Sequence, residues 1–434
     1  MIYNQETETM DREDLEQLQI ERLQTVLNRV YKNVSFYNKK FDEMKINIEN
    51  IKKIEDIKYL PFTTKQDLRN SYPYNMFAVP LKDIIRIHST SGTTGKPVII
   101  GYTKNDIKNW EQIVARCLSS VGITNHDFIQ ISFNYGFFTG GLGFHYGAER
   151  IGASVIPASS TDNALKQIMV MKDYKSSVIV CTPSYAVFIA KTIEKLKIHP
   201  EELYLKKGIF GAEPWTEKTR SYLEKTFNID AYDSYGLSEI FGPGVAEECE
   251  YKNGLHVNED HFIVEIINPN TLEPVEEGSE GELVFTTLTK EGFPVIRYRT
   301  GDITSINSEK CECGRTLKRI ARIKGRNDDL IFVNGSKFLP SEIEKVLFGN
   351  IENCESNYQI IIDKKDGIDT VEILVEVPDK IPFDENYQIL RLQSEIEKNV
   401  EYNLELKTKI TFVEPQSLNF SYNEKMRRVI DRRV

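Results

Sequence analysis

Apolar positions follow a helical period at the start of the chain and then change to short runs. Residues 12–33 place Leu23, Val26, Leu27 and Val30 at helical spacing among charges, which predicts an amphipathic opening helix. Thr63 or Thr64 is predicted to cap a short helix that follows. From residue 84 to about residue 240, apolar runs alternate with helical stretches, a pattern that predicts an α/β sheet covered on both faces. These runs are 84–87, 128–133, 153–157, 178–181 and 208–210.

The pattern changes twice more. Apolar runs at 262–267, 281–285 and 296–298 are separated by turns, which predicts a β-rich subdomain. After residue 329 the chain begins a new set of elements, with strands expected at 330–333, 358–362, 371–377 and 410–413 and helices at 340–347 and 385–402. The sequence therefore predicts an α/β protein. Its large N-terminal lobe, 1–327, has mixed and parallel sheets plus the β-rich subdomain, and its small C-terminal lobe, 328–434, is α+β.

Composition narrows the function classes. With 434 residues the chain is long enough for two or three lobes, and its 40% hydrophobic and 28% charged residues are typical of a globular protein. A net charge of -10 argues against nucleic acid as a main partner. The polar, acidic start is not a signal peptide, and no run approaches the length of a membrane span. Six cysteines in so long a chain do not form a disulfide framework, so a cytoplasmic location is expected. The oligomeric state stays open, a homodimer included.

A loop of small residues, Ser-Thr-Ser-Gly-Thr-Thr-Gly-Lys-Pro at 89–97, is the strongest local signal of chemistry. Glycines allow backbone N–H groups to turn toward an anion, hydroxyls donate hydrogen bonds, and a lysine adds positive charge. The apolar residues after Pro97 predict that the loop joins two strands. It is not a Walker loop, because Lys96 is followed by proline rather than by Ser or Thr and a helix. Taken alone, a flexible linker explains the composition equally well.

Four further segments follow in a fixed order. They read Gly-Ala-Glu-Pro at 211–214, Tyr-Asp-Ser-Tyr-Gly-Leu-Ser-Glu at 232–239, Tyr-Arg-Thr-Gly-Asp at 298–302 and Ile-Lys-Gly-Arg-Asn-Asp-Asp at 323–329. Together with the loop and a lysine near the C-terminus, they resemble the ordered motifs of adenylate-forming enzymes. Within that superfamily the chain resembles the phenylacetate–CoA ligases, through segments at 137–143, 145–150 and 286–290. The resemblance runs from about residue 60 to the last residues.

This resemblance implies a site for ATP and Mg²⁺. The loop residues Ser91, Gly92, Thr93, Thr94 and Lys96 would hold the β- and γ-phosphates. Glu239 would ligate Mg²⁺, because hard cations take oxygen ligands, and Asp302 would accept hydrogen bonds from the ribose. In isolation Asp302 is also explained as a turn residue and Glu239 as a solvated or capping residue. The other nucleotide-binding residues that the resemblance implies are Lys65, Gly211, Ala212, Glu213, Pro214, Asp233, Ser234, Tyr235, Gly236 and Arg326.

The resemblance also implies a mobile C-terminal lobe. Lys425 aligns with the lysine that assists adenylation, although Glu424 precedes it where relatives usually have glycine. The lobe would rotate about Asp328 between two half-reactions. This rotation would bring Lys425 into the active site for the first half-reaction and remove it for the second. As a residue of a basic tail, Lys425 is also compatible with a solvated surface position.

Cysteine and histidine spacing points to a second, structural site. Cys311 and Cys313 stand one residue apart in a turn, and Cys249 and His256 lie upstream. Two cysteines at this spacing can face one tetrahedral ion, and a distant Cys/His pair can complete the set. The sequence therefore predicts a structural Zn²⁺ site, with His261 as a spare ligand; two exposed thiols and an unrelated buried cysteine are the alternative. Cys117, Cys181 and Cys354 are interpreted as small buried apolar residues.

The segment at 134–141 combines aromatics with glycines and predicts a flat apolar slot for the acid. A planar aryl ring fits such a slot better than a long acyl chain, although ordinary core packing explains some of these aromatics. The substrate-binding residues expected are Tyr135, Phe138, Gly140, Ala212 and Gly236.

The predicted function is thus a two-step ligase that takes ATP, an aryl acid and coenzyme A as small-molecule partners. Two alternatives stay open. One is an adenylating enzyme with another acceptor, either a carrier-protein thiol or an amine, and the other is a non-catalytic nucleotide-binding relative. A zinc-dependent hydrolase is disfavoured, because four protein ligands leave no open position on the metal.

Overall fold

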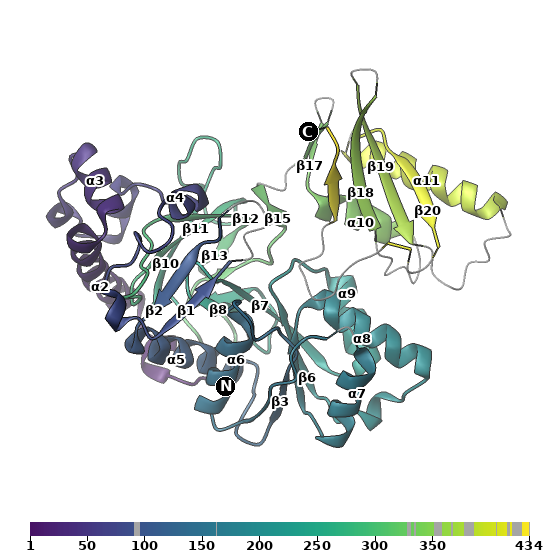
Figure 1. Ribbon diagram of the computed structural model, residues 1–434, viewed down its shortest axis with the longest axis horizontal. Helices are drawn as coiled ribbons and strands as arrows, with labels where there is room; N and C mark the ends of the chain where they lie inside the picture. Colours follow the sequence, from purple (N-terminus) through teal and green to yellow (C-terminus); the bar gives the residue numbers. More distant parts are fainter. Residues whose placement is uncertain are drawn as a thin grey trace. The chain divides into compact units, whose positions relative to one another are not determined.

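The computed structural model describes the chain apart from residues 91–95, 162, 328–330, 334–335, 351–357, 366–367, 377–385, 405, 415–416, 419–427 and 434. The described residues form two compact units, Met1–Ile323 and Lys324–Val434 (Figure 1). The predicted lobe boundary at residues 327 and 328 lies a few residues beyond this division and stays a prediction.

A nine-stranded mixed sheet forms the centre of the first unit. In spatial order its strands are β13 (Ile306–Asn307), β14 (Arg319–Ile320), β9 (Leu255–Val257), β8 (Gly242–Glu248), β7 (Asp230–Leu237), β6 (Lys207–Gly211), β5 (Val178–Cys181), β3 (Phe128–Ile131) and β4 (Ser154–Ile156). Neighbours from β7 to β4 run parallel, whereas β8, β9, β14 and β13 continue the sheet antiparallel. All four residues of β5 are buried, as expected for a central parallel strand that is apolar throughout.

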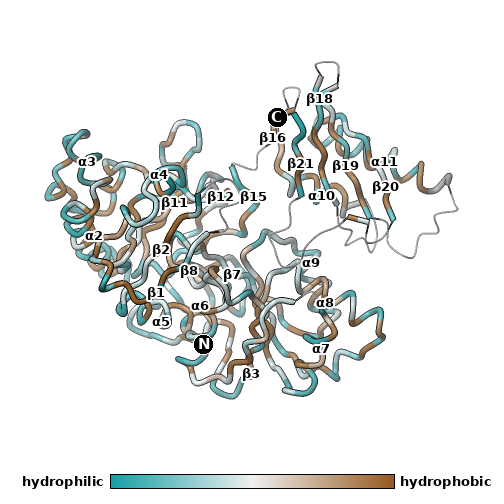
Figure 2. The backbone as a smooth tube through the Cα atoms, in the orientation of Figure 1, coloured by the Kyte–Doolittle hydropathy of each residue, from teal (hydrophilic) through white to brown (hydrophobic). Residues whose placement is uncertain are grey.

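Helices lie on both sides of this sheet, as predicted (Figure 1). They are α5 (Lys104–Ser120), α6 (Gly140–Arg150), α7 (Ala164–Asp173), α8 (Pro183–Leu196) and α9 (Glu217–Phe227). α5 and α6 pack on β8, α8 packs on β6 and α9 on β7. Figure 2 shows the apolar colouring concentrated on inner strands such as β3, whereas many of the connecting loops are hydrophilic.

The small-residue loop joins two strands, as predicted. β1 (Arg86–Ser89) and β2 (Ile99–Tyr102) pair antiparallel in a two-stranded sheet, with Ser89 opposite Ile99. The apolar run at 84–87 therefore does not belong to the large sheet, contrary to the expectation from its alternation with helices. Its pairing partner is the strand just across the loop rather than a strand beyond a helix.

The β-rich subdomain is also confirmed. β10 (Phe262–Ile267), β11 (Gly281–Thr287) and β12 (Tyr298–Thr304) pair antiparallel in this order. β12 begins where the predicted strand was expected to end, because the chain bends at Arg297, whose φ is 44°. Asp302 therefore lies within a strand and not in a turn.

The N-terminal region is helical. Its helices are α1 (Gln5–Glu8), α2 (Arg12–Asn33), α3 (Ser35–Glu43) and α4 (Lys65–Asn70), with short 3-10 turns η1 (Ile48–Asn50), η2 (Ile54–Tyr59), η3 (Leu81–Asp83) and, after α8, η4 (Pro200–Glu202). α2 is the predicted amphipathic helix and buries its apolar face in the core of the unit. Thr64 caps α4 in a reciprocal arrangement with Asp67, so the second of the two predicted caps is correct.

The second unit has its own apolar core. Its elements are β15 (Gly325–Arg326), β16 (Ile331–Val333), β17 (Ser336–Phe338), α10 (Pro340–Asn350), β18 (Tyr358–Lys365), β19 (Ile368–Glu376), α11 (Asn386–Leu404), β20 (Lys409–Val413) and β21 (Val429–Asp431). β18 and β19 form an antiparallel pair at the centre of a four-stranded sheet, with β20 and β21 added in parallel at its edges. The α+β composition matches the prediction for this part of the chain.

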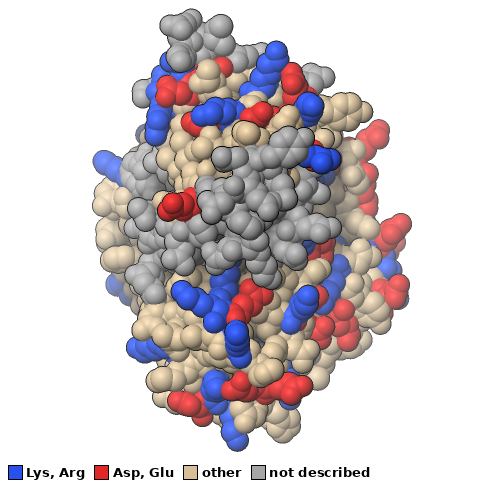
Figure 3. Space-filling model, turned by 90° about the vertical axis from the view of Figure 1, so that its right-hand side faces the viewer, with Lys and Arg blue, Asp and Glu red and all other residues tan. Residues whose placement is uncertain are grey.

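Basic and acidic side chains are interspersed on the face drawn in Figure 3. Over the part of the chain that the structure describes, no helix is long and apolar enough to cross a membrane.

Candidate active site

Three segments of the first unit meet at the end of β1. Ser89 N donates to the carbonyl oxygen of Phe137 at 3.1 Å, and His88 Nδ1 lies 3.0 Å from the same oxygen. Two residues further on, Thr139 Oγ1 lies 3.0 Å from Ser238 Oγ. The start of the predicted phosphate loop, the aromatic and glycine segment, and the turn that carries Glu239 are therefore in direct contact.

Glu239 lies in the turn between β7 and β8. The N–H groups of Ile240 and Phe241 both donate to the carbonyl of Leu237 at 3.2 Å, which closes the turn. A Cβ on Gly236 would lie 2.0 Å from the carbonyl oxygen of Gly242, so only glycine fits there. The side chain of Glu239 is 7% exposed. The tight turn thus holds a largely buried carboxylate at the carboxyl end of β7.

Tyr235 and Asp302 join this turn to β12. Tyr235 donates from its hydroxyl to Asp302 Oδ2 at 2.6 Å, and both side chains are buried. The Tyr235 ring stacks on Phe285 of β11 with centroids 6.2 Å apart. A predicted adenine neighbour and the predicted ribose acceptor are therefore linked by a short hydrogen bond.

Asp233 lies on the same strand and contacts an arginine that the sequence analysis did not identify. Arg322 donates from Nε to Asp233 Oδ2 at 3.2 Å, and its guanidinium lies 4.7 Å from the Trp215 ring centroid. Burial raises the pKa of Asp233 to about 6, while the charge of Arg322 opposes that shift. Arg322 precedes the Gly-Arg-Asn-Asp-Asp motif, and its pairing with Asp233 and its position over Trp215 become evident in the structure and not in the sequence.

Gly211 to Pro214 lie at the carboxyl end of β6, beside β7. A Cβ on Gly211 would lie 2.2 Å from the carbonyl oxygen of Ser234, and Ala212 has a positive φ of 69°. Glu213 Oε2 accepts from the N–H of Ser184 at 3.3 Å. Because carboxyl ends of parallel strands meet at one edge, this segment lies next to the strand that carries Asp233, Ser234, Tyr235 and Gly236.

The aromatic and glycine segment is only partly packed. Tyr135 lies with its hydroxyl 3.2 Å from His145 Nδ1, and burial raises the pKa of this tyrosine. Gly140 begins α6, and a Cβ there would lie 3.3 Å from the Phe133 ring. Phe137 and Phe138 are 75% and 43% exposed. Core packing therefore accounts for some of these aromatics and leaves two rings open to a ligand.

Several predicted residues lie outside the described part of the chain. These are Ser91, Gly92, Thr93, Thr94, Asp328 and Lys425, together with Cys354. Lys96 is exposed, with Nζ 5.4 Å from the Tyr72 ring centroid. Lys65 is half-buried at the start of α4, and Arg326 belongs to β15 of the second unit.

The four residues predicted to bind zinc come together between β8, β9 and the turn at 311–314. The ligand atoms of Cys249, His256, Cys311 and Cys313 all lie within 4.8 Å of one another. Cys249 Sγ is 3.8 Å from Cys311 Sγ, and Cys313 Sγ is 3.4 Å from His256 Nε2. A tetrahedral zinc site with Zn–S bonds of about 2.3 Å and Zn–N bonds of about 2.0–2.1 Å separates sulfurs by ~3.8 Å and sulfur from nitrogen by ~3.6 Å. The cluster has the donor set and the spacing for such an ion.

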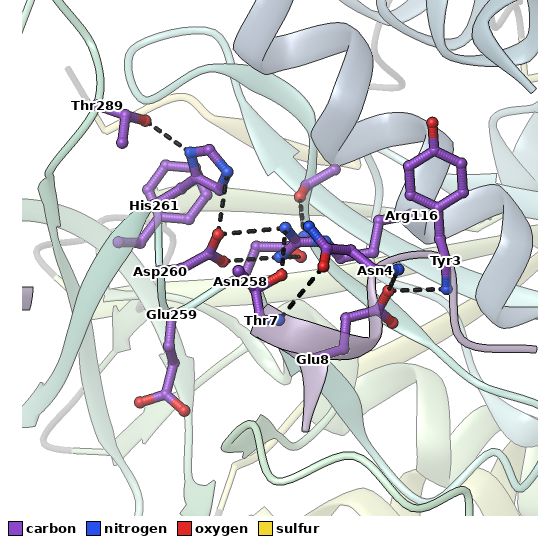
Figure 4. Close-up of polar contacts among 12 residues, drawn as sticks. Tyr3, Asn4, Thr7, Glu8, Arg116, Asn258, Glu259, Asp260, His261 and Thr289 are labelled. Atoms are coloured by element: carbon purple, nitrogen blue, oxygen red, sulfur yellow. Dashed lines mark hydrogen bonds and ion pairs between the residues drawn. The ribbon is translucent and has the colours of Figure 1, made fainter. Parts of the chain in front are cut away.

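His261, the spare ligand, belongs to a different network (Figure 4). Its Nδ1 lies 2.7 Å from Thr289 Oγ1 and its Nε2 3.3 Å from Asp260 Oδ2. Asp260 also pairs with Arg116 at 2.7 Å. Burial lowers the pKa of His261 to about 4, so the ring is neutral at pH 7. Glu8 lies near this network and accepts from the N–H groups of Tyr3 and Asn4, which ties down the N-terminus (Figure 4).

The chain matches two family models. Residues 9–288 match the AMP-binding enzyme model, and residues 335–433 match the AMP-binding enzyme C-terminal domain. The chain is 41% identical to a phenylacetate–coenzyme A ligase of Thermus thermophilus over all of both chains. It belongs to the AMP-binding enzyme family, in the phenylacetate–coenzyme A ligase group. A second member of this group, from Escherichia coli, is 44% identical over 85% of this chain and 84% of its own length.

A comparison with solved structures supports the same family assignment. A 2-hydroxyisobutyryl-CoA ligase in the postadenylation state, in complex with R3-HIB-AMP, has a TM-score of 0.92 and 25% identity, covering all of this chain and 92% of that one. The predicted fold class and the predicted class of enzyme, an ATP-dependent, AMP-forming CoA ligase, are confirmed at the level of this AMP-binding family.

Proposed function

We propose that the protein joins an aryl carboxylic acid to coenzyme A at the expense of ATP. The contact of three segments through Phe137 and Thr139 supports this proposal, because it joins the start of the predicted phosphate loop to the aromatic segment, and the aromatic segment to the turn that carries Glu239. The exposed rings of Phe137 and Phe138 beside α6 offer an apolar surface for a planar acid. The phenylacetate–coenzyme A ligases at 41% and 44% identity support the aryl class.

The reaction has two steps. The carboxylate of the acid attacks the α-phosphorus of ATP, which releases pyrophosphate and leaves an acyl adenylate. The thiol of coenzyme A then attacks the acyl carbon, its proton passes to solvent, and AMP leaves with the electron pair of the broken C–O bond. No nucleophile of the protein is needed, so positioning and charge neutralisation are the main contributions of the chain.

The predicted ligands of the phosphates, the ribose and the metal act in the first step. The hydroxyls of Ser91, Thr93 and Thr94 and the cation of Lys96 hold the β- and γ-phosphates. Asp302 accepts from the ribose hydroxyls. Glu239 would supply a carboxylate ligand for Mg²⁺, which would neutralise phosphate charge.

The second unit brings a cation for adenylation. Lys425 neutralises charge that develops on the phosphates and then withdraws, with Asp328 as the hinge, so that coenzyme A can reach the adenylate. In this proposal ATP and the acid bind to lobe 1–327, and lobe 328–434 is the mobile cap. Arg326, next to the hinge, approaches the nucleotide.

The Cys249, His256, Cys311 and Cys313 cluster holds a structural Zn²⁺ in this proposal. The four residues would fill all positions of a tetrahedral ion, so the metal would link β8 and β9 to the turn at 311–314 and would have no open position for the reaction. Reduced thiols at this site agree with a cytoplasmic location.

A screen of carboxylic acids tests the substrate class. Purified protein is incubated with ATP, Mg²⁺ and one acid at a time, and pyrophosphate release and the mass of the coenzyme A product are measured. Phenylacetate and related aryl acids should release pyrophosphate and add the acyl mass to coenzyme A, whereas acetate and long-chain acids should not. Pyrophosphate release without a coenzyme A thioester would favour another acceptor, and no release with any aryl acid would refute the proposal.

A further inference from the structure

Lys290 is a buried lysine for which the reaction described above has no role. Its side chain is 1% exposed and lies among three aromatic rings, with Nζ 4.6 Å from the centroid of Tyr102, 5.2 Å from that of Phe241 and 5.4 Å from that of Phe293. Nζ donates to the carbonyl oxygen of Ile240 at 2.6 Å. Ile240 is the residue that follows Glu239, so the hydrogen bond ends on the turn that carries the proposed Mg²⁺ ligand.

The backbone around Lys290 is fixed from the other side by α5. Asp106, in the first turn of that helix, accepts from the N–H of Glu291 at 2.6 Å and from the N–H of Gly292 at 2.9 Å. A Cβ on Gly292 would lie 2.7 Å from the carbonyl oxygen of Gly101. Asn109 donates from Nδ2 to the carbonyl of Thr289 at 3.2 Å. Lys290 therefore projects from a rigid support toward the turn.

A lysine is an unfavourable residue where packing alone is needed. An amine removed from water loses hydration, and an apolar side chain of similar length would fill the aromatic cage without that loss. Burial accordingly lowers the pKa of Lys290 to about 7, while the carboxylates of Asp106 and Glu239 act in the opposite direction. The position thus holds a lysine that interacts with both the carboxylate that anchors its own backbone and the carboxylate of the turn.

We propose that Lys290 is a positioning residue for adenylation. Its hydrogen bond to the carbonyl of Ile240 fixes the backbone next to Glu239 and so the position of that carboxylate. This inference rests on the proposed role of Glu239 in the first half-reaction. Because the second half-reaction uses a preformed acyl adenylate and needs no metal-bound triphosphate, Lys290 should matter for the first step and not for the second.

The test compares the two half-reactions in Lys290→Met. Acid-dependent ATP–pyrophosphate exchange measures the first, and thioester formation from supplied acyl adenylate measures the second. Their ratio does not depend on how much of the variant is correctly folded. We expect the ratio to fall by about 10-fold to 100-fold, the range for losing a hydrogen bond from a charged group. An equal loss in both half-reactions, or no loss, would overturn the inference.

Lys207 offers a matched control. Its Nζ also donates to main-chain carbonyls, those of Val121 at 2.6 Å and Gly122 at 2.9 Å, away from the Glu239 turn. Lys207→Met removes a lysine–carbonyl contact of the same kind and should leave the ratio within about 2-fold of the wild type. A fall comparable to that of Lys290→Met would mean that the ratio reports general loosening, and the inference would be wrong.

A double-mutant cycle with Glu239→Gln separates this inference from the proposed function. If Lys290 acts through Glu239, the double variant should have the ratio of Glu239→Gln alone, within about 2-fold. A further drop in the double variant would overturn the inference and leave the role of Glu239 intact. An unchanged ratio in Glu239→Gln itself would overturn the proposed role of that carboxylate and, with it, this inference.

Discussion

The hydrogen bond between Tyr235 and Asp302 offers a direct test of the nucleotide site. Tyr235→Phe removes the hydroxyl that donates to Asp302 Oδ2 at 2.6 Å and keeps the ring that stacks on Phe285. Both residues are buried, at 8% and 6% exposure, so water does not readily replace the lost donor. Asp302, the proposed ribose acceptor, then loses a contact that fixes its orientation.

The size of the effect follows from the kind of bond. A hydrogen bond to a charged group contributes about 1.5–3 kcal/mol, and about 1.4 kcal/mol corresponds to a factor of ten in an equilibrium constant. If the whole of this contribution serves nucleotide binding, the Kd of ATP rises about 10-fold to 100-fold. Any part of the contribution that serves the fold instead lowers the free energy of unfolding, because a buried acceptor loses a partner.

The assay measures the Kd of ATP by calorimetry, the KM of the acid in pyrophosphate exchange and the free energy of unfolding in urea. Tyr37→Phe is the matched control. Tyr37 is fully buried, and its hydroxyl lies 2.9 Å from Thr63 Oγ1 and accepts from Ile296 N at 3.0 Å. This control should lose stability without any change in the Kd of ATP. If Tyr235→Phe loses stability but binds ATP as the wild type does, Asp302 does not bind the ribose.

Three further outcomes are expected. Cys313→Ser should lower the zinc content measured by elemental analysis from one ion per chain and lower the Tm, whereas His261→Gln should keep the ion. Since the folded pKa of His261 is depressed from 6.5 to about 4, its contribution to stability is present above pH 6.5 and is lost as the pH falls toward 4. The stability of the wild type relative to His261→Gln, from urea unfolding, should therefore decrease by about 2 kcal/mol between pH 8 and pH 5. Lys425→Ala should abolish acid-dependent pyrophosphate exchange and spare thioester formation from supplied acyl adenylate. Equal loss of both activities would refute the proposal that Lys425 acts only in the first half-reaction.

Some of these assignments follow from the sequence because the signal is local. The opening helix is predicted from apolar residues at helical spacing, since packing one face of a helix requires that period. The Cys-x-Cys spacing places two possible metal ligands in one short turn. With the upstream cysteine and histidine they form a donor set that is typical of structural zinc sites. The order of the Gly-rich and acidic motifs indicates the enzyme family without any contact being known.

Other features depend on which segments the fold brings together. The run at 84–87 pairs with the strand across its own loop instead of the large sheet, and β12 begins after the bend at Arg297. Which of several possible strands a run pairs with depends on packing in the whole fold and not on the residues of the run itself. Arg322 has no motif that marks it, and its pairing with Asp233 arises only when β7 meets the chain 89 residues later.

The sequence by itself therefore determined the fold class, the family and the type of each proposed site residue, because periodicity and motif order are properties of the chain. Tertiary structure alone decided which residues support that site. In the sequence Lys290 is indistinguishable from a surface lysine. In the structure it donates to the carbonyl of Ile240 and lies among three aromatic rings, and its proposed effect on Glu239 depends on that buried position.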